Sequence, residues 1–315
     1  MAQSSGTGRR WLKYGCLGCV GVVGLVVLIV AVVVGVALTK ARSQQIEDQV
    51  VSQEVPSPAL PPPPGVETGG AESIGAGPVE AAGHVILRLQ HADFEIRPGP
   101  PGGPVRVEAT YDKKSYTLEQ RFEAPEGAPW TYEVGFRGSG ASLITTLMEM
   151  LGGTSPRVRV LLPVDVPLSL DFELREGGAE VELGKLWLTS ADIEFNRSGF
   201  QLGVDRPLRA PMERLSIVGS MGGFEASSLG NASPRELEVD FSMGGMDLDL
   251  RGRWAGDSDI SLRSSMGGGV LRLPRDVRIE GLATSRIGDP TETEVEPPTL
   301  RFSVSSDMGN LEILD

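Results

Sequence analysis

Short segments in which apolar and polar residues alternate recur along most of the chain after residue 83. Examples are "HVILRLQ" from His84, "VRVEATY" from Val105 and "RVRVLL" from Arg157. Alternation of this kind over a short run is typical of β-strands that bury one face. The pattern therefore predicts an all-β fold for this part of the chain.

One segment has a different period. Residues 139–153, "SGASLITTLMEMLGG", place Leu143, Leu147 and Met150 at helical spacing, with serine before them and two glycines after them. These features predict one short amphipathic helix that covers an open sheet edge, or alternatively docks a partner.

A repeat of about 22 residues organises the last half of the chain. "SMGG" occurs at 220–223, 242–245 and 265–268. Aligned on the methionine, seven units are centred on Glu176, Ser198, Met221, Met243, Met266, Ile287 and Met308. The regular spacing predicts a β-solenoid-like repeat stack over residues 166–315. A meander of hairpins joined at the glycine turns is the alternative architecture.

The residues that flank each methionine indicate a bend. Apolar residues lie six and four positions before it and three and five positions after it, as Leu215, Ile217, Phe224 and Ala226 do around Met221. The odd step changes the buried face at the glycines. We therefore expect the methionine to end the inward face of one strand, and the residue after the first glycine to adopt a left-handed backbone. The predicted structural corners are Met221, Gly222, Gly223, Met243, Gly244, Gly245, Met266, Gly267, Gly268, Ile287, Gly288, Met308, Gly309 and Asn310.

Stacked units would align the methionines in a column. Thioether sulfurs bind soft metals such as Cu(I). Isoleucine takes the same position at Ile287 and cannot ligate a metal, whereas methionine commonly fills irregular gaps in a core. We therefore favour packing for the column, and expect no metal and no cofactor.

The N-terminal region predicts membrane attachment. Residues 15–38 form a run of 24 residues without a charge, long enough for a transmembrane helix. A cleaved secretory signal is the alternative, but its apolar run would be shorter. Residues 1–14 form a short basic tail, and their cations favour a cytoplasmic N-terminus with the C-terminal domain extracytoplasmic. Residues 39–82, with Pro61–Pro64, predict a Pro/Gly-rich linker, followed by a strand-rich lead-in at 83–165.

The charge balance limits the partners. All 42 acidic residues follow residue 42, together with 24 of the 29 basic residues. This acidity argues against nucleic acid as a partner.

Candidate chemistry is sparse. Cys16 and Cys19 are the only cysteines and lie at the start of the predicted membrane helix, so no disulfide framework is expected beyond it. Their spacing suggests redox or metal chemistry, but small residues packed in a membrane helix, or acylation, are simpler interpretations. The two histidines, His84 and His91, are expected on opposite faces of a strand and form no recognised motif.

Two acidic pairs could in principle hold a hard cation. Asp247 with Asp249, and Asp257 with Asp259, each share a strand face. Because Leu248 and Leu250 alternate with the first pair, we favour solvated outward charges that discourage aggregation between sheet edges.

Several segments resemble a known bacterial family. These are "VRVLLPVDVPLSL" from Val158, "MGGMDLDLRG" from Met243 and "SSMGGGVLRLPRDVRIEG" from Ser264. They are similar to adhesin-like β-solenoid domains of unknown function and to the toastrack module of cell-wall-active antibiotic response proteins. The resemblance spans roughly the last three quarters of the chain and implies a fold, with no catalytic residues to carry over.

We therefore expect a membrane-tethered, non-enzymatic envelope scaffold or binding protein of adhesin-like character. A regulatory component of an envelope-stress or antibiotic response is the alternative, and a polysaccharide-active enzyme is the third. Partners would be the membrane, a protein or envelope polymer, and a second copy of the chain bound through the open ends of the stack.

Overall fold

The computed structural model describes residues 46–56, 80–138, 155–282 and 296–314. The predicted membrane helix at 15–38, the predicted helix at 139–153, and the corner residues Ile287 and Gly288 lie outside these ranges. Within the described ranges, no helix has the length and apolarity needed to span a bilayer.

The all-β prediction is confirmed for the described part of the chain. Its only helical element is a single 3₁₀ turn, Leu229–Asn231. The strands are β1 (Ile46–Gln53), β2 (Gly83–Pro98), β3 (Val105–Asp112), β4 (Tyr116–Glu123), β5 (Trp130–Gly138), β6 (Arg157–Leu162), β7 (Leu168–Glu182), β8 (Leu188–Gly203), β9 (Arg214–Gly219), β10 (Gly222–Ser227), β11 (Glu236–Asp249), β12 (Ser258–Arg272), β13 (Arg278–Glu280) and β14 (Thr299–Leu314).

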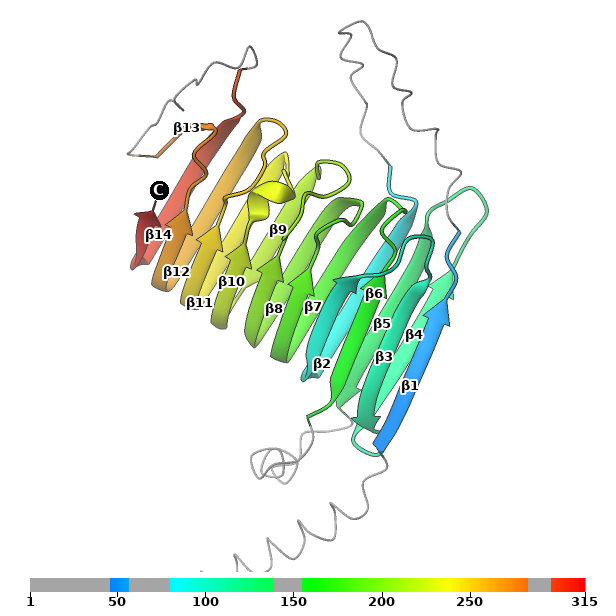
Figure 1. Ribbon diagram of the computed structural model, residues 1–315. Coiled ribbons are helices and arrows are strands. Elements are labelled where there is room, and N and C mark those ends of the chain that lie inside the picture. The colour runs from blue at the N-terminus through cyan, green and yellow to red at the C-terminus, as the bar shows by residue number, and fades with distance from the viewer. Residues whose placement is uncertain (1–45, 57–79, 139–154, 283–295, 315) are drawn as a thin grey trace, which may run out of the picture. The chain divides into compact units, whose positions relative to one another are not determined.

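Most of these strands form one parallel stack, seen as a row of arrows in Figure 1. Along it, β2, β7 and β8 are followed by β9 with β10, and then by β11, β12 and β14. The register aligns the repeat, since Ala92, Gly177, Ser198, Gly222, Gly244, Gly267 and Gly309 are successive partners. Because neighbouring strands run parallel, the hairpin meander was wrong.

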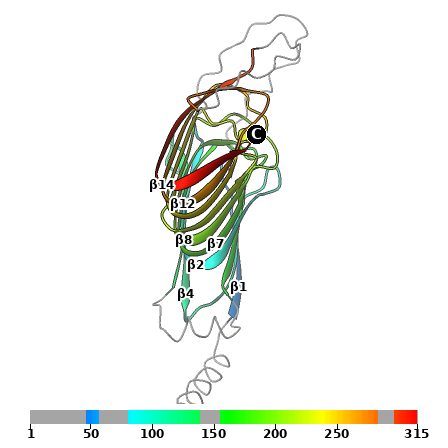
Figure 2. The same cartoon turned by 90° about the vertical axis from the view of Figure 1, so that its left-hand side faces the viewer.

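Each long strand of the stack bends near its middle, as the curved strands of Figure 2 show. β9 and β10 are the two arms of one such strand, interrupted at Ser220 and Met221. β8 pairs with β9 before the bend and with β10 after it. The stack therefore has two layers, one of first arms and one of second arms, with apolar side chains packed between them.

The predicted change of buried face is confirmed in the middle of the stack. Leu215 and Ile217 are fully buried before the bend, and Phe224 and Ala226 are buried after it. The same alternation holds in β11. The two arms thus turn their apolar residues toward each other, which explains the odd step in the sequence.

The left-handed backbone lies on the first glycine of the motif and not on the second, contrary to expectation. Gly244 has φ of +131°, and the second glycines Gly223, Gly245 and Gly268 have no positive φ. A Cβ on Gly244 would lie 1.9 Å from the carbonyl oxygen of Gly222 on the neighbouring strand. The first glycine is therefore required both by its backbone angle and by the close approach of the adjacent strand.

The stack begins earlier than the predicted boundary at residue 166. β2 pairs with β7 in parallel from Gly83 to Ile96, so it is a full member of the repeat. The sequence did not reveal it because its corner carries no glycine; His91 itself adopts the positive φ, at 55°.

At this end the two layers continue as separate sheets. The first arm of β2 pairs with β5, which pairs with β4. Its second arm pairs with β6, which continues to β3 and β1. Phe136 lies between the sheets, with its ring stacked on Tyr116 and edge-on to Phe94 and Tyr111.

Part of the predicted linker is a strand. Ile46–Gln53 forms β1, antiparallel to β3. The Thr110 hydroxyl donates to Asp48 Oδ1 at 2.7 Å, and the Tyr111 hydroxyl donates to Gln49 Oε1 at 2.9 Å. Such an edge strand is held largely by backbone and polar contacts, so its sequence carries only a weak apolar pattern.

The other end of the stack departs from sequence order. β12 pairs directly with β14, so Met266 is the partner of Met308, two repeat lengths later. β13 lies on the far side of β14 and pairs with Thr299–Arg301 alone. Val304 and Ile313, at positions buried in earlier repeats, are 38% and 39% exposed.

Candidate functional site

The residues at the bends form a continuous row across the stack, which we call the corner row. In register from β2 to β14, it consists of His91, Glu176, Arg197, Met221, Met243, Met266 and Met308. Alignment of the internal repeats predicts Ser198 in this row. The register of the paired strands places Arg197 there instead. Arg197 adopts φ of 50°, so this bend is made one residue earlier than the glycine pattern suggested.

The first half of the corner row is polar, and its side chains are paired. Glu176 lies between two cation-forming side chains: its Oε2 is 3.0 Å from His91 Nδ1, and its Oε1 is 2.7 Å from Arg197 Nη2. These side chains are at least one-third exposed. Charge pairs across neighbouring strands of this kind stabilise the register modestly.

The second half of the row consists of methionines, and three of them are exposed. Met221, Met243 and Met266 are 43%, 40% and 41% exposed. The prediction that they end the inward face, and the packing interpretation that went with it, were wrong. The bend encloses the core on its inner side, so a side chain at the vertex points outward. Met246, three residues beyond the vertex, is buried instead.

A shallow groove runs across the second arms beside this row. Its volume is about 650 Å³. The floor is formed by the second glycines of the repeat, at which a Cβ would meet open space. The lining includes the glycines Gly199, Gly223, Gly245 and Gly268 and the polar side chains Gln201, Glu225, Asp247 and Glu312. Without side chains on the glycines, the backbone of four strands is accessible from outside.

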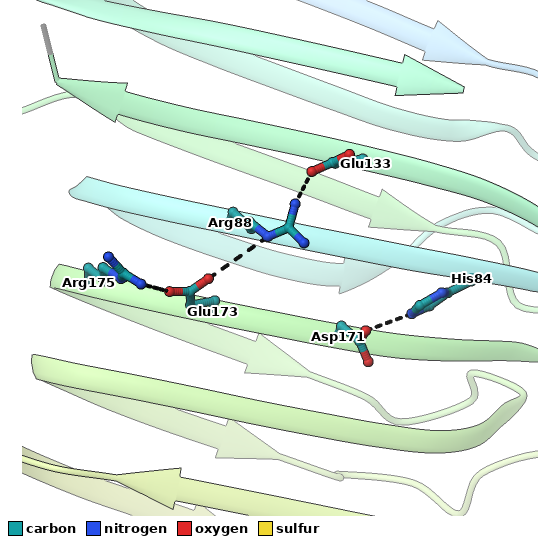
Figure 3. Close-up of polar contacts among 6 residues, drawn as sticks. All are labelled: His84, Arg88, Glu133, Asp171, Glu173 and Arg175. Atoms are coloured by element: carbon teal, nitrogen blue, oxygen red, sulfur yellow. Dashed lines mark hydrogen bonds and ion pairs between the residues drawn. The ribbon is translucent and has the colours of Figure 1, made fainter. Parts of the chain in front are cut away.

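A separate polar surface lies on the first arms, shown in Figure 3. His84 Nε2 is 2.8 Å from Asp171 Oδ2, and Arg88 pairs with Glu133. Glu173 accepts a hydrogen bond from Arg175 at 2.6 Å. The first two pairs join neighbouring strands, whereas Glu173 and Arg175 both belong to β7. Arg88, Asp171 and Glu173 line a shallow pocket of about 350 Å³ on this surface.

The two histidines do not share a site. His84 contacts Asp171 and His91 contacts Glu176, so each is bonded to a different acid of β7. Each therefore takes part in a cross-strand pair.

The acidic pairs differ from one another. Asp247 is partly exposed and pairs with Arg272. Asp249 is only 8% exposed, contrary to the prediction, and accepts hydrogen bonds from the Arg251 guanidinium at 2.8 and 2.7 Å. Burial raises the pKa of Asp249, but the bonds from Arg251 outweigh that effect and hold the pKa below its usual value. Asp249 therefore stabilises the turn after β11 as a paired carboxylate.

Asp257 joins the last strands of the stack. The backbone N–H of Thr299 donates to its Oδ1 at 2.9 Å, and Arg301 lies 3.0 Å from its Oδ2. The bond from Thr299 and the charge of Arg301 lower the pKa of Asp257. Like Asp249, this acid is engaged by the protein itself.

No cluster of three or more His, Cys, Asp or Glu side chains suited to a metal occurs in the described part of the chain. Cys16 and Cys19 lie outside it. The features with unassigned chemistry are thus the groove and the exposed methionines.

Comparison with known proteins gives distant structural similarity only. No protein family and no curated protein matches the sequence. A proposed cell adhesion protein of Clostridium sporogenes is 11% identical, with 85% of this chain and 99% of that chain covered at a TM-score of 0.37. A proposed adhesin of Bacteroides fragilis is 6% identical, with 86% and 97% covered at 0.37. At these values the similarity assigns no function.

Proposed function

We propose that this chain is a non-enzymatic, adhesin-like binding or scaffold protein of the cell envelope. In this proposal the segment 15–38 anchors it in the membrane with the N-terminus in the cytoplasm. The strand domain then lies on the outer side. The observation that carries the proposal is the open, glycine-floored groove across the second arms.

The repeat supports a solenoid architecture for this domain. We propose that each bent strand with its following loop is one coil of a β-solenoid, about 22 residues in length. The parallel, in-register pairing of β7 through β12 supports this arrangement. Such a stack presents equivalent positions at equal intervals, which suits binding to a repetitive ligand.

The shape of the groove suits an extended chain. It crosses strands from β8 to β14, and parallel neighbours lie about 4.8 Å apart, so its length is roughly 20 Å. Gly223, Gly245 and Gly268 leave its floor free of side chains. We propose an envelope polymer that lies along the stack and contacts the backbone through this gap.

The residues of the groove support binding in preference to catalysis. Its lining contains no histidine, cysteine or lysine within the described residues. Asp247 forms an ion pair with Arg272, which leaves it poorly placed to exchange a proton with a substrate. Glu225 and Glu312 are the other acids of the lining, and the proposed function assigns a catalytic role to none of the three.

The proposed binding site is tested by substitutions that fill the groove with side chains. Gly223→Gln, Gly245→Gln and Gly268→Gln, combined in the full chain reconstituted in liposomes, add side chains at positions where the structure leaves space. Binding to purified envelope polymers and to whole cells is measured. We expect loss of binding, with Glu194→Gln on the exposed face of β8 as a control that binds normally.

Two results would contradict the proposal. One is equal binding by the filled variant, which would place the contact elsewhere. The other is release of products from an envelope glycan by the purified chain, which would make the protein an enzyme.

Membrane attachment has its own test. We expect the full chain to remain in the pellet after alkaline carbonate extraction, and a chain that lacks residues 1–42 to be released. Added protease should cleave the strand domain in intact cells. A soluble full chain, or protection of the domain, would contradict this part of the proposal.

The exposed end of the stack supports a further partner, for which we propose a second copy of the chain. β13 covers three residues of β14, whereas Val304, Ile313 and Leu314 expose apolar side chains farther along the strand. Strand ends of this kind pair readily with another strand.

A further inference from the structure

Neither the bend nor the core requires methionine at the exposed positions of the corner row. Other corners of the same stack carry His91, Glu176 and Arg197, so the bend does not require methionine. The core does not require it either, because Met221, Met243 and Met266 are about 40% exposed. Three consecutive strands nevertheless present a thioether at the same outward position.

The structure also removes the sequence argument against a metal. Ile287 was expected to stand between Met266 and Met308 in the column. Instead, Met266 and Met308 are direct partners, because β12 pairs with β14. No isoleucine interrupts the row from Met221 to Met266 or its continuation into β14.

The local backbone holds the three methionines in line. Neighbouring in-register strands lie about 4.8 Å apart. The Ser242 hydroxyl donates to the carbonyl oxygens of Gly219 and Ser220 at 3.3 and 3.1 Å, which ties the residue before Met243 to the adjacent strand. A Cβ on the glycine after each methionine would lie within 2.0 Å of a carbonyl oxygen of the neighbouring strand, so a register shift that placed a side chain there would cause a clash.

The side chains can converge from these fixed positions. A methionine side chain has three rotatable bonds and a polarizable sulfur. The sulfurs of Met221 and Met266 can therefore lean toward that of Met243 from either side. Water has open access to all three, so an ion can enter without any change in the fold.

We propose that Met221, Met243 and Met266 form a surface site for one soft monovalent cation of the Cu(I) class, held by thioether sulfurs with Met243 at the centre. Uncharged soft ligands select such ions over Zn²⁺, Mg²⁺ or Ca²⁺. The site is separate from the glycine-floored groove and does not rest on the proposed function.

The test uses Ag⁺ as a soft ion that stays in one oxidation state. The full chain carries Cys16→Ser and Cys19→Ser so that no thiol competes, and its methionine methyl groups are labelled with ¹³C. One equivalent of Ag⁺ in chloride-free buffer should shift the methyl signals of Met221, Met243 and Met266. The signals of the buried Met212 and Met246 should not move.

Calorimetry with matched variants supplies the second readout. Met243→Leu, which keeps the volume of an exposed side chain, should weaken Ag⁺ binding roughly tenfold or more. Met246→Leu should leave it unchanged, as should addition of Zn²⁺. The proposal is overturned if the three methyl signals do not shift, or if the combined Met221→Leu, Met243→Leu and Met266→Leu variant binds Ag⁺ as well as the parent.

Discussion

The ring of Phe195 stacks on that of Phe200, with centroids 4.9 Å apart and planes within 6° of parallel. Both residues belong to β8, on opposite sides of its bend. A straight strand would place residues five apart far from contact. The contact therefore shows that the two arms of one strand enclose the core.

Truncation of Phe195 tests how much this contact contributes. Phe195→Ala removes a fully buried ring that also packs near Phe224 and Phe241, so we expect a loss of about 3–5 kcal/mol in the free energy of unfolding. Urea denaturation measures it, with the exposed Val218→Ala as the matched control, expected within about 0.5 kcal/mol of the parent. Equal effects of the two changes would contradict a core between the arms.

Substitution of the two glycines of one motif should affect stability to different degrees. Gly244→Ala places a Cβ against the Gly222 carbonyl at a positive φ, and strain of this kind costs on the order of 1–3 kcal/mol. Gly245→Ala adds a Cβ to open space on ordinary backbone and should be close to neutral. The comparison of their urea midpoints checks this difference. A neutral Gly244→Ala would show that the strands are not in close register at this bend.

The paired carboxyl of Asp249 makes the free energy of unfolding depend on pH. Its pKa is lowered in the folded state, so its contribution is present at pH 7 and is lost as the pH falls below about 3.9, the value for an unfolded chain. Asp249→Asn should destabilise the protein at pH 7 by roughly 1–2 kcal/mol. Urea denaturation at pH 7 and at pH 3 should show a smaller difference between variant and parent at the lower pH. A difference in stability between variant and parent that is larger at pH 3 than at pH 7 would contradict the ion pair with Arg251.

Association through β14 predicts a dependence on its apolar side chains. Val304→Lys combined with Ile313→Lys places two charges on the exposed end of the stack. We expect the detergent-solubilised full chain to sediment as a dimer and this variant as a monomer. The exposed Val50→Lys on β1, at the other end, serves as the control and should remain dimeric. A monomeric parent chain would refute the proposed self-association.

The sequence predicted the repeat and the buried positions well, because apolar alternation reports directly which face of a strand meets the core. It missed β1 and assigned β2 to a separate region for different reasons. β1 is an edge strand with few buried side chains, and the bend of β2 uses His91 in place of a glycine. Neither feature leaves an apolar or glycine signal in a single sequence.

The candidate sites were harder to predict. Alternation cannot show on which side of a bend the vertex residue points, so Met243 was expected inside and lies outside. The second glycine, Gly245, was interpreted as a backbone requirement, whereas it forms the floor of a groove. The direct pairing of β12 with β14 depends on contacts between distant segments, and no local pattern around Ile287 could reveal it.

The most direct test of the stack is disulfide formation between corner positions in a chain free of Cys16 and Cys19. Met243→Cys with Met266→Cys places two thiols on neighbouring in-register strands, within the Cα separation of roughly 4.4–6.8 Å that a disulfide spans. Met221→Cys with Met266→Cys places them two strands apart, beyond that range. We predict rapid cross-linking of the first pair on mild oxidation and none within the second. Cross-linking of the second pair within one chain, or the absence of cross-linking in the first pair, would contradict the in-register stack.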